Sequence, residues 1–249
     1  MSGHSKWATI KRSKGLVDAK RGKMFTKVGK EIMAAAKQGG GDPRMNPRLR
    51  TAIAAGKAVN MPSDNIKKAI MKGTGELAAE QLDDIIYEGF GPGGVAIMVE
   101  TTTDNKNRTP SEMRQLFSKY GGNMGEPGSV AWMFEKKGVI EVPKTAMGEE
   151  ELMTLALDAG ADDMQTDDKN NYTVTTAPTQ FDAVVEKIKT KVEPESAEIT
   201  MVPKTYMAVE GKTAESLLKL LDALDDHDDV QKVHANFDID DELMEKLRG

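Results

Sequence analysis

The periodicity of apolar residues changes near residue 78, and this change constrains the fold more than any single motif. Before that point apolar residues recur three and four positions apart, as in Phe25, Val28 and Ile32, which is typical of amphipathic helices. Asn46-Pro47 is typical of a helix start, because asparagine caps free backbone N–H groups and proline tolerates the first helical position. Residues 1–78 are therefore predicted to form a small, all-helical domain.

Strand and helix signals alternate beyond residue 78. Apolar, β-branched runs at 85–88 and 95–102 flank a glycine-rich turn and predict a pair of strands. The sequence Thr109-Pro-Ser-Glu112 predicts a capping box that opens a helix. A further strand is predicted at 130–134, after a second glycine-rich loop.

Residues 138–202 carry signals in the order βαββαβ, which is the ferredoxin-like arrangement. The tail adds a strand, a helix and a strand, too little to fold alone, so it is expected to complete the sheet begun before residue 135. The predicted fold class is multi-domain, α plus α+β, with one α+β domain inserted in the other. The predicted domains are 1–78, then 79–135 joined with 204–249, and the inserted, ferredoxin-like 136–203.

Charge is divided between the two parts of the chain. The whole chain carries a net −6. Residues 1–75 hold 17 Lys and Arg against 4 Asp and Glu, a net of +13, and the rest hold 17 against 36, a net of −19. Such asymmetry is typical of a nucleic-acid-binding module joined to other domains.

The basic N-terminal region is accordingly predicted to bind phosphates. A solvated helix face is the simpler alternative, but such a face mixes charge signs, and only Asp18, Glu31, Asp42 and Asp64 oppose the cations. An acidic lipid surface is a weaker alternative, because the apolar stripe of the first helix lacks bulky Trp and Leu. The candidate nucleic-acid-binding residues are Lys6, Lys11, Arg12, Lys14, Lys20, Arg21, Lys23, Lys27, Lys30, Arg44, Arg48 and Arg50.

Other classes of site find little support. The chain has no cysteine and three histidines, which excludes disulfides and thiolate sites and disfavours a histidine-rich metal site. No nucleophile elbow or P-loop occurs, so no catalytic residue, cofactor or metal is expected, and the chain is predicted not to be an enzyme. No apolar run approaches a membrane span and no secretory signal is recognised, which predicts a cytoplasmic protein without a membrane partner.

Two further patterns are interpreted as structural. Gly89-Phe-Gly-Pro-Gly-Gly94 matches the letters of a dinucleotide-binding motif, but it precedes a strand-like run and not a helix, so a tight turn is expected. The acidic cluster at 225–229 lacks calcium-loop spacing and is interpreted as a solvated surface that repels nucleic acid. The acidic α+β domains remain candidates for contacts with other proteins.

Long motifs throughout the chain closely resemble the YebC/PmpR family. The resemblance covers essentially the whole sequence. Its motifs include Gly3-His-Ser-Lys-Trp7, Asp18-Ala-Lys-Arg-Gly22, Asn46-Pro-Arg-Leu-Arg50, Tyr87-Glu-Gly-Phe-Gly-Pro-Gly-Gly94, Ser118-Lys-Tyr-Gly-Gly122 and Gly128-Ser-Val-Ala-Trp-Met-Phe134.

The resemblance implies a basic helical domain and two α+β domains, one inserted in the other. It also implies a transcriptional regulator that binds DNA. Related members, including the mitochondrial translational activator of cytochrome c oxidase, are tied instead to ribosomes and to translation through proline-rich stretches. A DNA-binding regulator is therefore the leading hypothesis, and a factor bound to ribosomal RNA is the alternative. The preference for DNA or RNA, the target, the oligomeric state and the sign of regulation stay open.

Overall fold

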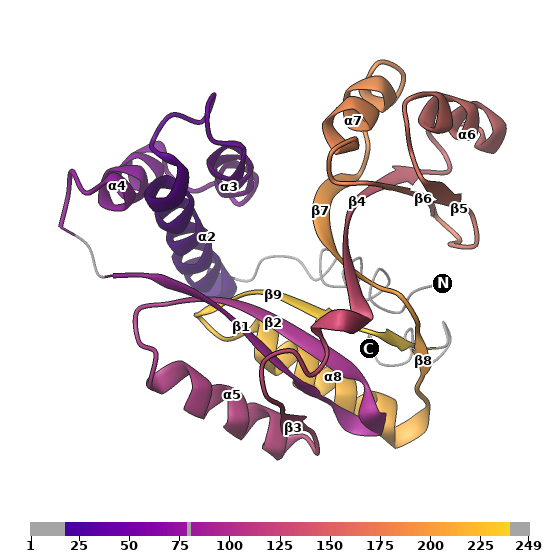
Figure 1. The fold of residues 1–249 in the computed structure, drawn as a ribbon. Helices are drawn as coiled ribbons and strands as arrows, with labels where there is room; N and C mark the ends of the chain where they lie inside the picture. Colours follow the sequence, from indigo (N-terminus) through magenta and orange to yellow (C-terminus); the bar gives the residue numbers. More distant parts are fainter. Residues whose placement is uncertain (1–17, 79–80, 240–249) are drawn as a thin grey trace.

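Within the residues that the structure describes, three helices form the N-terminal part. The computed structural model describes residues 18–78 and 81–239. Helix α2 is the longest and lies between the other two (Figure 1). The helices are α2 (Asp18–Gly39), α3 (Pro47–Ala58) and α4 (Ser63–Thr74). Their shared core includes Ile32, Leu49 and Ile66, so the predicted apolar stripe of the first helix is confirmed.

Asn46 fixes the start of α3 as the sequence predicts. Its side-chain oxygen accepts the N–H of Leu49 at 3.0 Å, and Pro47 occupies the first helical position. The buried amide group also donates to the carbonyls of Ala35 and Gly40 at 2.8 and 2.9 Å. One side chain therefore caps α3 and fastens it to the end of α2.

A four-stranded sheet forms the middle of the molecule, in the order β3-β1-β2-β9. Helices α5 and α8 cover one of its faces (Figure 1), with a core that includes Ile97, Phe117 and Leu217. The strands are β1 (Asp83–Phe90), β2 (Ala96–Thr103), β3 (Asn123–Met124) and β9 (Val230–Ala235), and the helices are α5 (Arg108–Lys119) and α8 (Gly211–Asp225). Strand β9 comes from the tail, so the tail completes this sheet as expected.

The second sheet has the order β5-β6-β4-β7 and its own core, which includes Ile140, Leu152 and Val184. Its elements follow the predicted βαββαβ order. They are β4 (Phe134–Pro143), α6 (Glu149–Asp158), β5 (Asp163–Gln165), β6 (Asn171–Thr176), α7 (Phe181–Lys189) and β7 (Ser196–Pro203). The predicted fold class is confirmed, whereas the domain boundaries stay predictions.

Three local predictions are wrong. Residues Ala131–Met133 form a 3-10 helix (η2) and not a strand. The tail segment Met207–Ala208 (β8) pairs in parallel with Phe237–Asp238 (β10) and not with the middle sheet. Helix α5 has no Thr109 capping box, because it already begins at Arg108 and the Thr109 hydroxyl is turned into a buried polar network.

The glycine-rich motif before β2 is a turn, as predicted. Pro92–Gly94 form a 3-10 turn (η1), in which Gly93 and Gly94 have φ of 79° and 80°. Such backbone favours glycine. Among the described residues, no helix combines the length and apolar character that a membrane span requires.

Candidate nucleic-acid interface

The predicted cations fall into three groups in the structure. Lys6, Lys11, Arg12 and Lys14 lie outside the described residues. Lys20 and Arg21 belong to the first turns of α2, and their side chains also lie outside the described part. The side chains that the structure describes are those of Lys23, Lys27, Lys30, Arg44, Arg48 and Arg50.

Lys23, Lys27 and Lys30 meet the segment that joins α8 to β9. Lys23 donates to the carbonyl of Asp226 at 3.4 Å, and Lys27 donates to the carbonyl of Asp225. Lys30 forms an ion pair with Asp229 at 2.5 Å, with 15% of the lysine side chain and 1% of the aspartate side chain exposed. The structure therefore brings these three lysines against the acidic part of the protein itself.

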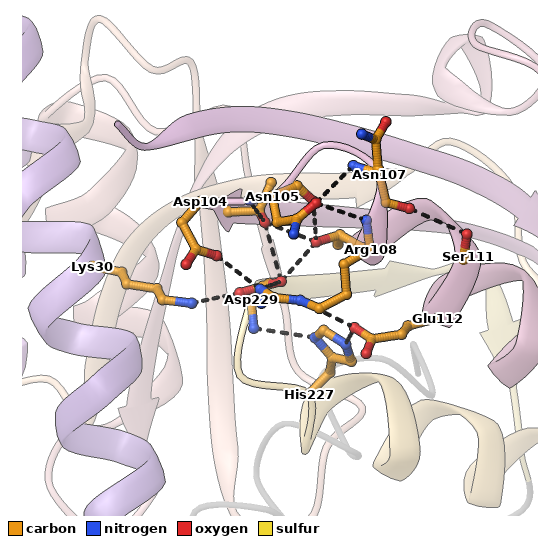
Figure 2. A network of polar contacts seen from close by, with 11 residues as sticks. Lys30, Asp104, Asn105, Asn107, Arg108, Ser111, Glu112, His227 and Asp229 are labelled. Carbon is orange, nitrogen blue, oxygen red and sulfur yellow. Dashed lines mark hydrogen bonds and ion pairs between the residues drawn. The ribbon is translucent and has the colours of Figure 1, made fainter. Parts of the chain in front are cut away.

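Asp229 is the centre of a polar network between α2, α5 and the end of α8 (Figure 2). Besides Lys30, its carboxylate accepts the Thr109 hydroxyl at 2.7 Å and the Arg108 guanidinium at 3.0 Å. Burial alone raises the pKa of Asp229, but the hydrogen bonds from Lys30, Thr109 and Arg108 outweigh it and hold that pKa well below its usual range. The interpretation of 225–229 as a solvated acidic surface is therefore wrong for Asp229.

Glu112, His227 and Asp229 lie close enough together to resemble a metal-ligand cluster (Figure 2). The Nδ1 atom of His227 accepts the backbone N–H of Asp229 at 3.1 Å, so the neutral ring carries its proton on Nε2. That nitrogen faces Glu112 at 2.9 Å. Because Lys30 and Arg108 already supply the positive charge around these carboxylates, the geometry fits an internal hydrogen-bond network better than a metal site.

The described arginines differ in how fully the protein engages them. Arg48 binds Glu31 at 2.8 Å and Asp84 at 2.7 Å, and the hydrogen bond to Glu31 contributes most to raising its pKa. Arg44 is exposed and pairs with Asp42 beside it. Arg50 is exposed and donates only a long hydrogen bond, 3.3 Å, to a backbone carbonyl.

Besides Arg50, helices α3 and α4 carry four cations that were not among the residues predicted from the sequence, Lys57, Lys67, Lys68 and Lys72. We call Arg50, Lys57, Lys67, Lys68 and Lys72 the outer cations, because all five are exposed. None of them forms an ion pair with another residue of the described part of the chain. On α4, Ile66 and Ala69 face the core, which leaves the intervening lysines in solvent. The helical period of the buried residues could have identified the four lysines, because an amphipathic helix keeps its polar residues on the face opposite the buried ones.

Two family models match consecutive parts of the chain. The model described as the TACO1/YebC protein N-terminal domain matches residues 5–76, and the model described as the TACO1/YebC second and third domain matches residues 82–237. Relatives are similar over their full length. A "probable transcriptional regulatory protein" of Acidobacterium capsulatum is 56% identical over 250 residues, covering 100% of both chains. One from Geobacter sulfurreducens is 57% identical over 248 residues, covering 99% of this chain and 100% of the relative.

A solved structure shares the architecture. The crystal structure of a conserved hypothetical protein from Aquifex aeolicus superposes with a TM-score of 0.81 at 48% identity, covering 92% of this chain and 95% of that one. The family models together span helices α2, α3 and α4 and the two four-stranded sheets. The chain therefore belongs to the TACO1/YebC family.

Proposed function

We propose that this protein is a non-enzymatic regulatory protein that binds nucleic acid, with duplex DNA as its ligand, through its N-terminal helical domain. The observation that carries the proposal is the set of outer cations on α3 and α4, which stay in solvent without an ionic partner in the described chain. Phosphate binding by such cations releases counterions and is therefore favourable without any base contact. The names of the relatives, probable transcriptional regulatory proteins, support a regulatory role.

The charge around these helices favours a polyanion as the ligand. Between residues 47 and 76 the acidic residues are Asp64 and Glu76. The same range contains six cations, which are Arg48, Arg50, Lys57, Lys67, Lys68 and Lys72. Arg48 is engaged with Glu31 and Asp84, so the outer cations remain for an external ligand.

A comparison of two triple variants tests the proposal. In the first, Lys67, Lys68 and Lys72 are changed to Gln. In the matched control, Lys187, Lys191 and Lys212 are changed to Gln, which removes the same charge from exposed positions of the other domains. Binding of each full-length variant to fluorescein-labelled duplex DNA is measured by fluorescence anisotropy.

The α4 variant is expected to lose about tenfold or more in affinity, since each lost phosphate contact weakens the counterion term, and the control is expected to lose much less. Equal losses in the two variants would show that total charge and not this domain governs binding. An A-form RNA duplex in parallel measures the alternative ligand, and tighter binding to RNA than to DNA at the same salt would favour the ribosomal RNA hypothesis.

A further inference from the structure

Helix α8 ends in a way that is unfavourable for an isolated helix. Its last turns contain Asp222 and Asp225, its C-terminal cap is Asp226, and it has no basic residue in the last turn. The C-terminal end of a helix carries partial negative charge, so carboxylates there repel the free carbonyl groups. An unfavourable helix end of this kind is expected where a contact with another part of the fold compensates for the repulsion.

The compensating charges come from α2. Lys23, Lys27 and Lys30 are spaced four and three residues apart, which places them on one side of the helix. Lys23 and Lys27 donate to the carbonyls of Asp226 and Asp225 at the end of α8, and Lys30 reaches the Asp229 carboxylate just beyond it (Figure 2). Three successive lysines thus bind a short stretch rich in negative charge, as they would bind a run of phosphates.

The contact between the helical domain and the middle sheet is polar. The apolar core of α2, α3 and α4 and the core below the middle sheet are separate clusters with no common residue. Two more cations donate across the boundary, Lys37 to the carbonyl of Leu82 at 2.9 Å and Arg48 to Asp84 at 2.7 Å. A polar boundary between separately packed domains allows relative motion and is weakened by salt and by competing anions.

We propose that residues 225–229 act as an internal substitute for nucleic acid, which occupies Lys23, Lys27 and Lys30 and keeps the helical domain docked. An external polyanion offers the same acceptor chemistry to the same lysines. It can contact all three only when the domain undocks, so nucleic acid binds the undocked form more tightly and shifts the population toward it. This inference rests on the proposed function and adds its regulation, because docking lowers the affinity for nucleic acid.

The first test compares two charge-matched double variants of the full chain. Asp226→Asn with Asp228→Asn removes exposed carboxylates from the segment, and Glu149→Gln with Glu150→Gln removes two exposed carboxylates from α6. The backbone carbonyls that accept from Lys23 and Lys27 remain in the first variant, so docking is weakened only through the loss of negative charge close to these lysines. Affinity for labelled duplex DNA is expected to rise about three- to tenfold more than in the control, the scale of two surface charge interactions. An equal rise in both variants would overturn the inference.

The second test measures docking directly. The chain contains no cysteine, so spin labels placed at Met45→Cys and Lys219→Cys, both at exposed positions, report the distance between the helical domain and α8. Saturating duplex DNA is expected to lengthen and broaden that distance distribution. An unchanged distribution together with binding would overturn the inference and leave the proposed function standing. Absence of binding at low salt would contradict the proposed function and the inference with it.

Discussion

Changing Asp229 to Asn removes the central charge of the network between the helical domain and the middle sheet. Lys30, with 15% of its side chain exposed, loses its carboxylate partner, and the bond from Arg108 loses its ionic character. Removing one member of a buried ion pair costs ~3–5 kcal/mol. Asparagine keeps an acceptor oxygen for Thr109, and Arg108 keeps Asp104, so we expect the free energy of unfolding to fall by about 2–3 kcal/mol.

Urea denaturation followed by circular dichroism measures this loss. Glu186→Gln is the control, because Glu186 is exposed on α7, away from this network, and it is expected to change the free energy of unfolding by less than ~0.5 kcal/mol. A double-mutant cycle that combines Asp229→Asn with Lys30→Met measures the coupling free energy between these two residues, which is expected to be about 1–2 kcal/mol. Equal midpoints for Asp229→Asn and Glu186→Gln, or a coupling near zero, would show that the ion pair does not join the domains.

Three further outcomes are expected in the same assay. Asn46→Ala removes the cap of α3 and two donated hydrogen bonds, one buried and one partly buried. It is expected to lower the free energy of unfolding by about 2–3 kcal/mol, whereas a loss below ~0.5 kcal/mol would contradict that role. Glu88→Gln is expected to lower the free energy of unfolding by about 2 kcal/mol. The carboxylate accepts the N–H groups of Gly128, Val130 and Ala131, and an amide NH₂ group cannot accept a hydrogen bond. An unchanged urea midpoint would be inconsistent with this role. Burial raises the pKa of Glu88, but those N–H groups outweigh it, and the pKa values of Glu88 and Asp229 are both lowered by the fold. As pH falls, the unfolded chain therefore binds protons first, so the free energy of unfolding should be level above about pH 5.5 and fall below about pH 4, and a loss centred near neutral pH would be unexpected.

The sequence predicts those parts of the fold that depend on local signals. Asn46 caps α3 because its side chain reaches the Leu49 N–H only three residues away. The βαββαβ order of the second sheet follows from alternating apolar runs in the same way. Thr109 shows where such signals fail. Its motif fits a capping box, but its hydroxyl binds Asp229, which lies 120 positions along the chain, and no local pattern carries that information.

The candidate site is less predictable for the same reason. Charge asymmetry identifies the N-terminal region, but it does not separate cations that the protein binds internally from cations left in solvent. Lys30 and Lys68 contribute equally to the charge of the N-terminal region, yet Lys30 is paired with Asp229 and Lys68 is exposed. The distinction arises from how α2 docks against the end of α8, which depends on contacts between residues about 200 positions apart.

The salt dependence of DNA binding shows whether the cations of the helical domain that are left in solvent neutralise phosphates. The logarithm of the association constant is measured against the logarithm of salt concentration for the full chain and for the Lys67, Lys68 and Lys72 to Gln variant. Each neutralised phosphate contributes a slope of about −0.9, so we expect a slope of about −3 or steeper for the natural chain and one shallower by about 2.7 for the variant, which lacks three of the cations. Binding that is indifferent to salt, or an identical slope for the two proteins, would show that these cations do not bind the phosphates.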